Sequence, residues 1–134
     1  MQINKVILLG YVGENPEINY FSEKNCVARF YMATNETYKN SEGKKIKNTL
    51  WHKIVLWKKL AEIAEKYIKK GMLLYVEGKI NYISNTDKHG KQIIITEIIG
   101  DKITMGKNIL EKKENEKKKK KNFNLQEKFD NLPF

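Results

Sequence analysis

One short segment holds the residues whose types and spacing are best suited to binding chemistry. It runs from residue 50 to 57 and reads Leu-Trp-His-Lys-Ile-Val-Leu-Trp. Because side chains alternate between the two faces of a β-strand, Trp51, Lys53 and Trp57 share one face. Unpaired bases stack on flat aromatic rings, and ammonium groups neutralise phosphates. This face therefore suits a single strand of nucleic acid, although burial of both indoles under a helix or a second subunit fits this strand alone equally well.

The charge of the chain favours a polyanionic partner, but its placement matters more than its size. The 134 residues carry a formal net charge of +10. Residues 1–106 contain 17 basic and 11 acidic groups and residues 107–134 contain 9 and 5, so both parts are basic. Lysine, isoleucine and asparagine, which have A- and T-rich codons, total 55 residues, so base composition explains part of the lysine count. Phosphate contacts are predicted for four basic residues: Arg29, Lys53, Lys58 and Lys79.

Motifs for catalysis, metal binding and cofactor binding are missing from the sequence. Cys26 is the only cysteine, which excludes a disulfide framework or a cysteine metal site. His52 falls on the core-facing side of its strand and is assigned a packing role, and His89 falls in a polar turn. No phosphate-cradling glycine loop, serine elbow or paired carboxylates are found. The sequence therefore predicts a protein that is not an enzyme and needs no metal or cofactor.

The pattern of apolar residues predicts five strands and one helix. Alternating or continuous apolar runs predict strands at about 5–13, 25–35, 46–57, 72–84 and 91–105. Apolar residues at helical spacing predict a helix over 60–68, with Gly71 as its C-terminal cap. Gly10 inside the first strand marks a bend, as a closing sheet requires. Three strands, one helix and two strands is the order of a five-stranded OB-fold barrel, an all-β fold with one helix that binds oligonucleotides.

The last part of the chain differs in composition from the barrel. Residues 107–128 are dominated by lysine, glutamate and asparagine without an apolar period, which predicts a disordered linker after a domain spanning 1–106. Residues 129–134 return to aromatic and aliphatic types, which suggests a short docking peptide, although a frayed end without a role also fits. The chain starts directly with an apolar strand, so we expect no targeting segment, and no apolar run approaches a membrane span.

Four stretches together resemble the bacterial-type single-stranded DNA-binding protein family. They are residues 4–10 with 15–17, residues 33–38, residues 51–62, and residues 71–80. The resemblance covers about residues 2–106, with an echo at the final residues. It implies an OB-fold homotetramer in the bacterial cytoplasm, associated with the nucleoid, that coats single-stranded DNA during replication, recombination and repair.

The resemblance also implies roles for particular residues. The base-stacking aromatics of the family fall on Tyr38, Trp51 and Trp57. A fourth falls on Asn85, which has no ring, and Tyr82 is the candidate replacement. The acidic, partner-recruiting tip of the family falls on a small set here: Asp130, Leu132, Pro133 and Phe134. Only one acid remains in that tip, and the preceding linker is rich in lysine.

Two other classes of protein remain as alternatives at this point. One is an interaction adaptor, such as an OB-fold component of a replication-restart complex, which binds a helicase first and DNA second. The other is an RNA-binding OB domain. The aromatic set and the Pro133-Phe134 ending favour binding of single-stranded DNA over both.

Overall fold

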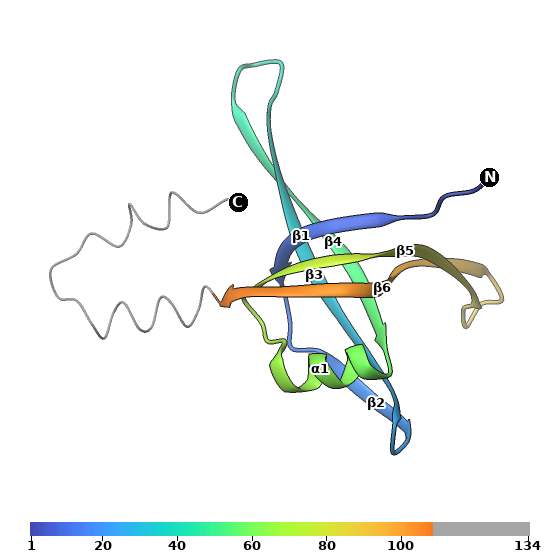
Figure 1. The fold of residues 1–134 in the computed structure, drawn as a ribbon. Helices are drawn as coiled ribbons and strands as arrows, with labels where there is room; N and C mark the ends of the chain where they lie inside the picture. The colour runs from blue at the N-terminus through green and yellow to red at the C-terminus, as the bar shows by residue number, and fades with distance from the viewer. Residues whose placement is uncertain (109–134) are drawn as a thin grey trace, which may run out of the picture.

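The computed structural model describes residues 1–108, which form six strands and one helix (Figure 1). The strands are β1 (Val6–Val12), β2 (Glu17–Ser22), β3 (Asn25–Lys39), β4 (Lys45–Trp57), β5 (Met72–Thr86) and β6 (Gln92–Asn108). The helix α1 (Lys59–Tyr67) connects β4 to β5. The predicted docking peptide and all but the first two residues of the predicted linker lie outside the described residues.

The strands form one sheet that closes on itself. Their order is β1-β5-β6-β4-β3-β2, and an additional pairing of β1 with β3 completes the ring. The contact of β4 with β6 is parallel, whereas the other pairings are antiparallel. A Cβ atom on Gly10 would collide with the backbone carbonyl of Ala33, so glycine allows β1 to approach β3 where the ring closes. The OB-fold barrel with one helix is thereby confirmed.

Strand β2 is the one element that the sequence analysis did not predict. Only Ile18 packs against the core, and the other residues of β2 are exposed. An apolar alternation is therefore almost missing, and the strand exists because its backbone pairs with β3. Strand β3 also runs to Lys39, four residues beyond its expected end, and pairs without interruption with β4.

Inward-facing side chains of the strands form one core. Alternate residues of β3, β4 and β5 are buried: Ala28, Phe30, Met32, Ile54, Leu56, Leu74 and Val76. Helix α1 closes one end of the barrel with Ala61 and Ala64, and Ile68 follows it into the core. The expectation that Gly71 caps this helix is wrong. The helix ends at Tyr67, because Ile68 takes an extended conformation, and Gly71 instead opens β5 with a positive φ of 89°.

Two hairpins extend beyond the barrel (Figure 1). One joins β3 to β4 and the other joins β5 to β6, and residues near both tips are exposed. The helix of the described part is far too short and polar to cross a membrane.

Candidate nucleic-acid interface

The predicted binding face of β4 lies on the outside of the barrel. Trp51 and Trp57 are 60% and 44% exposed, whereas Ile54 and Leu56 on the other face are fully buried. Lys53 lies between the indoles on the same outer face and is half-buried. Burial of both indoles is thereby contradicted for the single chain.

The neighbouring strand β3 adds side chains to this outer face. Residues that face each other across antiparallel strands point to the same side of the sheet. Tyr31 lies opposite Lys53, and Ala33 lies opposite Trp51. Tyr31 is 48% exposed and places a third ring between the two indoles. Tyr31 was not predicted to belong to the site, because the register between β3 and β4 cannot be read from the sequence.

Another aromatic residue that the sequence analysis missed lies beside Trp57. Phe21 lies near the end of β2, and its ring centroid is 6.1 Å from that of Trp57, with an angle of 20° between the planes. The Phe21 side chain is 66% exposed. No sequence pattern announced this contact, because β2 itself was not predicted.

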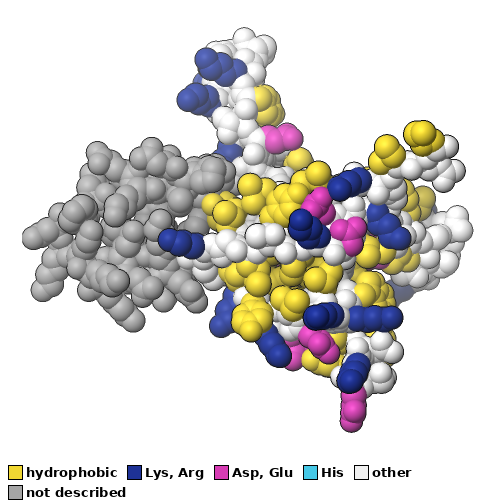
Figure 2. All heavy atoms as spheres, viewed as in Figure 1, with side chains coloured by type: hydrophobic (Ala, Val, Ile, Leu, Met, Phe, Trp, Pro, Cys, Tyr) yellow, Lys and Arg dark blue, Asp and Glu magenta, His cyan; other side chains and the backbone are white. Residues whose placement is uncertain are grey.

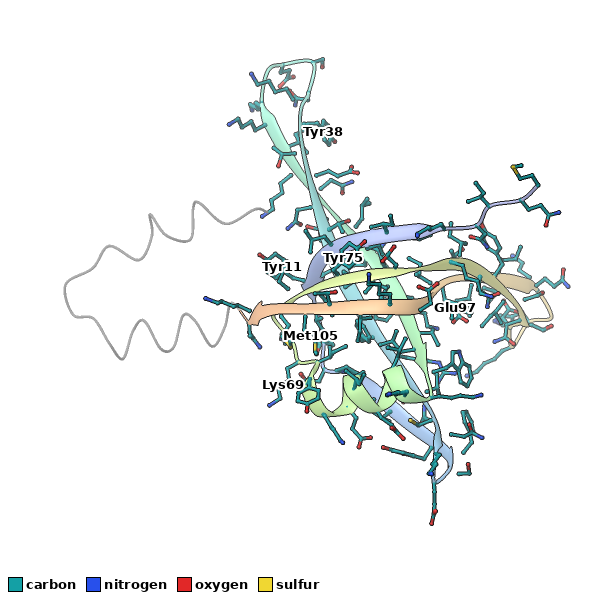
Figure 3. All side chains as sticks on the ribbon, in the orientation of Figure 1. Tyr11, Tyr38, Lys69, Tyr75, Glu97 and Met105 are labelled. Atoms are coloured by element: carbon teal, nitrogen blue, oxygen red, sulfur yellow. The ribbon has the colours of Figure 1, made fainter. Side chains whose placement is uncertain are left out.

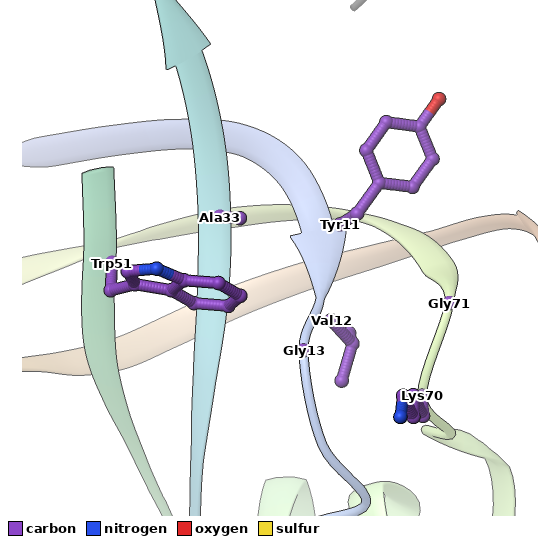
Figure 4. A pocket seen from close by; sticks show the side chains of 7 residues that line it. All are labelled: Tyr11, Val12, Gly13, Ala33, Trp51, Lys70 and Gly71. Atoms are coloured by element: carbon purple, nitrogen blue, oxygen red, sulfur yellow. The ribbon is translucent and has the colours of Figure 1, made fainter. Parts of the chain in front are cut away.

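A shallow cavity of about 280 Å³ lies next to Trp51 (Figure 4). The indole reaches across β3 toward Gly13, and Lys70 stands on the other side of the cavity. The segment that carries Lys70 is held in place by a hydrogen bond from the Lys70 amide to Asn15 Oδ1, 2.8 Å long. A Cβ atom on Gly13 would collide with the indole, so glycine is required for Trp51 to lie where it does.

Two of the predicted basic residues, Lys79 and Arg29, lie in one row that crosses four strands. In this row, pairing places Lys79 beside Ile99, Ile99 beside Val55 and Val55 beside Arg29. With strands about 4.8 Å apart, the backbone positions of Lys79 and Arg29 are roughly 14 Å apart when measured along the curved sheet. Lys58 follows Trp57 directly, at a φ of 54° in the connection to α1. In residues 1–108, none of Arg29, Lys53, Lys58 and Lys79 forms a salt bridge.

Two carboxylates share this outer face. Glu17 of β2 lies opposite Arg29, although the two do not form a salt bridge. Glu97 of β6 is buried, and its Oε1 accepts a hydrogen bond of 3.2 Å from Asn81 Nδ2. Of the four predicted basic residues, Arg29 is therefore the one with a carboxylate opposite it on the adjacent strand.

Tyr38 and Tyr82 lie apart from the tryptophans. Tyr38 is on the projecting β3–β4 hairpin (Figure 3) and lies opposite Ile46. By strand alternation it points to the opposite side of the hairpin from Trp51. Tyr82 is exposed on the β5–β6 hairpin opposite Thr96. Among the described residues, neither tyrosine has a ring contact with Trp51 or Trp57.

Two side chains that could bind a metal or exchange a proton, His52 and Cys26, make contacts within the fold. Thr34 Oγ1 and His52 Nε2 are 2.8 Å apart, and partial burial lowers the pKa of His52. Burial raises the pKa of the Cys26 thiol, whose Sγ is 3.6 Å from the Lys58 carbonyl oxygen. No three side chains of the metal-binding types gather within residues 1–108.

A second exposed surface lies on β1, β5 and β6, and we call it the aliphatic face. Figure 2 shows hydrophobic side chains gathered across the middle of this side. Ile7 and Leu9 are each 57% exposed, and Leu9 lies beside Tyr75. Glu77 on this face is paired, because its carboxylate lies 3.0 Å from Lys5 Nζ and 3.7 Å from Lys102 Nζ. The hydrogen bond between Lys5 and Glu77 raises the pKa of Lys5 and lowers the pKa of Glu77.

An OB barrel with exposed rings on the outside of β3 and β4 defines the class of an oligonucleotide-binding fold. Residues 3–106 match the model of the single-strand binding protein family. The chain belongs to this family.

Curated relatives agree with this assignment. A single-stranded DNA-binding protein of Neisseria meningitidis serogroup A is 39% identical over 105 residues, which are 78% of this chain and 60% of the relative. A protein of the same name from Bacteroides thetaiotaomicron is 45% identical over 107 residues, 78% of this chain and 66% of the relative. The chain therefore spans about three fifths to two thirds of the length of these relatives.

Solved structures match the fold. One is a Plasmodium falciparum SSB in complex with ssDNA, with a TM-score of 0.72 and 29% identity, covering 80% of this chain and 97% of that chain. Another is a deletion mutant of the single-stranded DNA-binding protein from Thermus aquaticus, with a TM-score of 0.69 and 20% identity, covering 80% and 52%.

Proposed function

We propose that this chain binds single-stranded DNA without sequence preference. The observation that carries the proposal is the outer face of β3 and β4, where Trp51, Tyr31 and Trp57 are exposed around Lys53. Exposure of apolar rings to water is unfavourable unless a partner covers them. Every base offers a flat face that can stack on such a ring. The relatives named as single-stranded DNA-binding proteins support the same partner.

In this mechanism the single-stranded DNA runs along β4. Trp57 lies six positions after Trp51, which corresponds to about 20 Å along an extended chain. That span accommodates several stacked or splayed bases, with Tyr31 between the two indoles. Lys53, Lys58, Lys79 and Arg29 neutralise phosphates, while Tyr38 and Tyr82 on the two hairpins receive bases beyond the barrel. Stacking and phosphate contacts carry no sequence information, which explains binding without sequence preference.

A titration that follows intrinsic fluorescence tests this function, because both tryptophans of the chain lie on the proposed face. We expect poly(dT) to quench the fluorescence, with an affinity that falls as salt rises. Tighter binding of poly(rU) than of poly(dT) would favour the RNA-binding alternative. Absence of binding to both polymers would refute the proposal.

We further propose that the chain assembles as a homotetramer through the aliphatic face. Exposed Ile7 and Leu9 lie beside a paired charge cluster, which is suited to contact with another protein surface. In addition, Val6–Leu9 pairs with β5 only, so the other edge of this stretch is open within the described residues. Light scattering at micromolar protein should give the mass of four chains, and a monomer mass would contradict this part.

The wider role that we propose is protection of single-stranded DNA in replication, recombination and repair, in the cytoplasm and close to the nucleoid. Residues 129–134, and in particular Asp130, Leu132, Pro133 and Phe134, would recruit DNA-processing proteins. Deletion of 132–134 should abolish capture of such partners while leaving DNA affinity unchanged. Capture that survives the deletion would exclude this role for the tip.

A further inference from the structure

Phe21 and Trp57 form an aromatic pair in direct contact. Their ring centroids are 6.1 Å apart and the angle between their planes is 20°, which is the geometry of offset stacking. The phenyl ring therefore covers part of one face of the indole. Trp57 is 44% exposed, whereas Trp51, on the same outer face of β4, is 60% exposed. The surface of Trp57 that does not meet Phe21 is open to a ligand.

The backbone of β2 places Phe21 beside the indole. The pairing of β2 with β3 shifts between Tyr20 and Ser22, so Phe21 lies at a β-bulge. Bulges redirect a side chain relative to a regular strand. The hydroxyl of Tyr20 donates a hydrogen bond of 2.6 Å to Glu65 Oε2 on α1. The end of the strand that carries Phe21 is therefore tied to the helix.

The indole of Trp57 also has apolar neighbours on its own face of the sheet. Val27 lies opposite Trp57 on β3, and Val55 precedes Trp57 by two residues, so both valines point outward with it. Both valines are nevertheless buried, although neither belongs to the main cluster of side chains inside the barrel. Side chains of the outer face, Trp57 among them, must therefore cover the valines. The base of the indole is packed, and Phe21 adds a contact to the ring itself.

We propose that Phe21 is a positioning residue for DNA binding. It holds the indole of Trp57 in one orientation, so that a base stacks on the face that Phe21 leaves open. This inference rests on the proposed function and adds a residue to it. An exposed side chain that rotates freely must be ordered when a ligand binds, which costs conformational entropy. A contact that fixes the ring in the free protein removes that cost.

Trp51 is held by a different kind of contact. A Cβ atom on Gly13 would collide with the indole of Trp51, so that ring lies directly against the backbone. Both indoles of β4 are therefore backed on one side, Trp51 by backbone and Trp57 by Phe21. Lys58, which directly follows Trp57, is exposed and forms no salt bridge within residues 1–108. A base on the open face of Trp57 thus has a phosphate-binding group one residue away.

A double-mutant cycle tests the proposal, with affinity measured by the fluorescence anisotropy of a labelled oligo(dT). Phe21→Ala should weaken binding by roughly two- to tenfold, the range expected for one aromatic pair. Phe21→Tyr keeps the ring and should have the affinity of the wild type. In a Trp57→Leu background, Phe21→Ala should cause no further loss, because the side chain that Phe21 positions is already missing.

Fluorescence of the free protein tests the positioning directly. In a Trp51→Phe background, Trp57 is the only indole of the chain. Phe21→Ala should lower the anisotropy of its emission and raise its quenching by acrylamide, since the ring gains motion and loses its cover. Phe21→Tyr should leave both values as they are. Anisotropy and quenching that do not respond to Phe21→Ala would overturn the proposal.

Tyr67→Ala is the matched control. Tyr67 is an exposed ring at the end of α1, and it has no ring contact among the described residues. Its removal should change neither the affinity for oligo(dT) nor the anisotropy and quenching of Trp57. Equal effects of Phe21→Ala and Tyr67→Ala would mean that loss of any exposed ring weakens binding, which would overturn the specific role of Phe21.

The possible results separate the positioning role from the proposed function. Unchanged affinity in Phe21→Ala, or tighter binding because Phe21 only shields Trp57, would overturn the positioning role while leaving DNA binding intact. A loss that persists in full in the Trp57→Leu background would also overturn it and would make Phe21 an independent stacking residue. Lack of binding by the wild type would instead refute the proposed function itself.

Discussion

The outer face of β3 and β4 and the aliphatic face on β1, β5 and β6 expose apolar surface in different chemical forms. The first presents flat rings, namely Trp51, Tyr31 and Trp57, with Lys53, which has no carboxylate partner within residues 1–108. The second presents Ile7 and Leu9 beside a carboxylate held by two lysines. Rings with unpaired lysines complement bases and phosphates, whereas branched aliphatic groups with paired charges complement another protein surface. We therefore expect the shape of the exposed apolar surface and the pairing of nearby charges, rather than the amount of that surface, to decide which partner each face binds.

Removing both indoles should have the largest effect on the first face. Trp51→Ala/Trp57→Ala is expected to weaken binding of single-stranded DNA by about 2–6 kcal/mol, since each stack contributes about 1–3 kcal/mol. Fluorescence anisotropy of a labelled oligonucleotide measures this change without relying on tryptophan. The oligomeric mass should stay the same, and unchanged affinity would mean that the rings are not the binding surface.

A charge introduced on the aliphatic face should lower the oligomeric mass and leave binding of single-stranded DNA intact. Leu9→Glu places a carboxylate without a partner in the proposed contact between chains, which costs about 3–5 kcal/mol when it is buried. Light scattering should show a smaller mass, and poly(dT) should still quench the tryptophan fluorescence. Leu9→Met is the control, because it keeps the apolar character. If Leu9→Glu leaves the mass unchanged, this face is not the contact.

The two kinds of lysine can be distinguished by salt. Lys53→Gln should lower the slope of log affinity against log salt by about 0.7, the value expected for one phosphate contact with a single strand. Lys5→Gln should leave the slope unchanged, because Lys5 is engaged by Glu77 at 3.0 Å. Equal changes in both variants would show that pairing within the chain does not decide which lysines bind phosphate.

A methyl group added at Gly13 tests how tightly the Trp51 indole packs against the backbone on the first face. Gly13→Ala should displace the indole of Trp51, because the added carbon would collide with it. We expect a change in the emission of Trp51 in a Trp57→Phe background and a loss of affinity of about 1 kcal/mol or less, since the exposed ring can move aside. The aliphatic face and the oligomeric mass should not respond.

Acid should remove the stabilising contribution of the ion pair between Lys5 and Glu77 on the aliphatic face. The pKa of Glu77 is lowered in the folded chain by Lys5, so its stabilising contribution is present above the unfolded pKa of about 4.3 and is lost as pH falls through the folded pKa. Thermal unfolding of the wild type and Glu77→Gln should therefore differ at pH 7 and converge once the pH falls below the folded-state pKa of Glu77. A difference between the two proteins that persists in acid would exclude this role for Glu77.

Much of the fold followed from local patterns in the sequence. Alternation in 50–57 predicted a strand with indoles on one face, and the change to helical spacing after Trp57 predicted α1. Both patterns are short-range, because burial of one face imposes the period of the element. Strand β2 lacked such a signal, since its only inward residue is Ile18. Gly71 gave a misleading signal, because a glycine with a positive φ is found at a turn into a strand as well as at the end of a helix.

By itself, the sequence determined which side chains share a face of a strand and that the fold has one helix between the third and fourth long strands. It also established that Trp51, Lys53 and Trp57 are neighbours, because they lie on one face of the same strand. The tertiary structure decided which residues from other strands join them. Tyr31, Phe21 and Lys79 reach the same outer face only through the registers between paired strands. A shift of one residue in any of these registers would turn those side chains to the other face, and only packing of the whole barrel fixes the register.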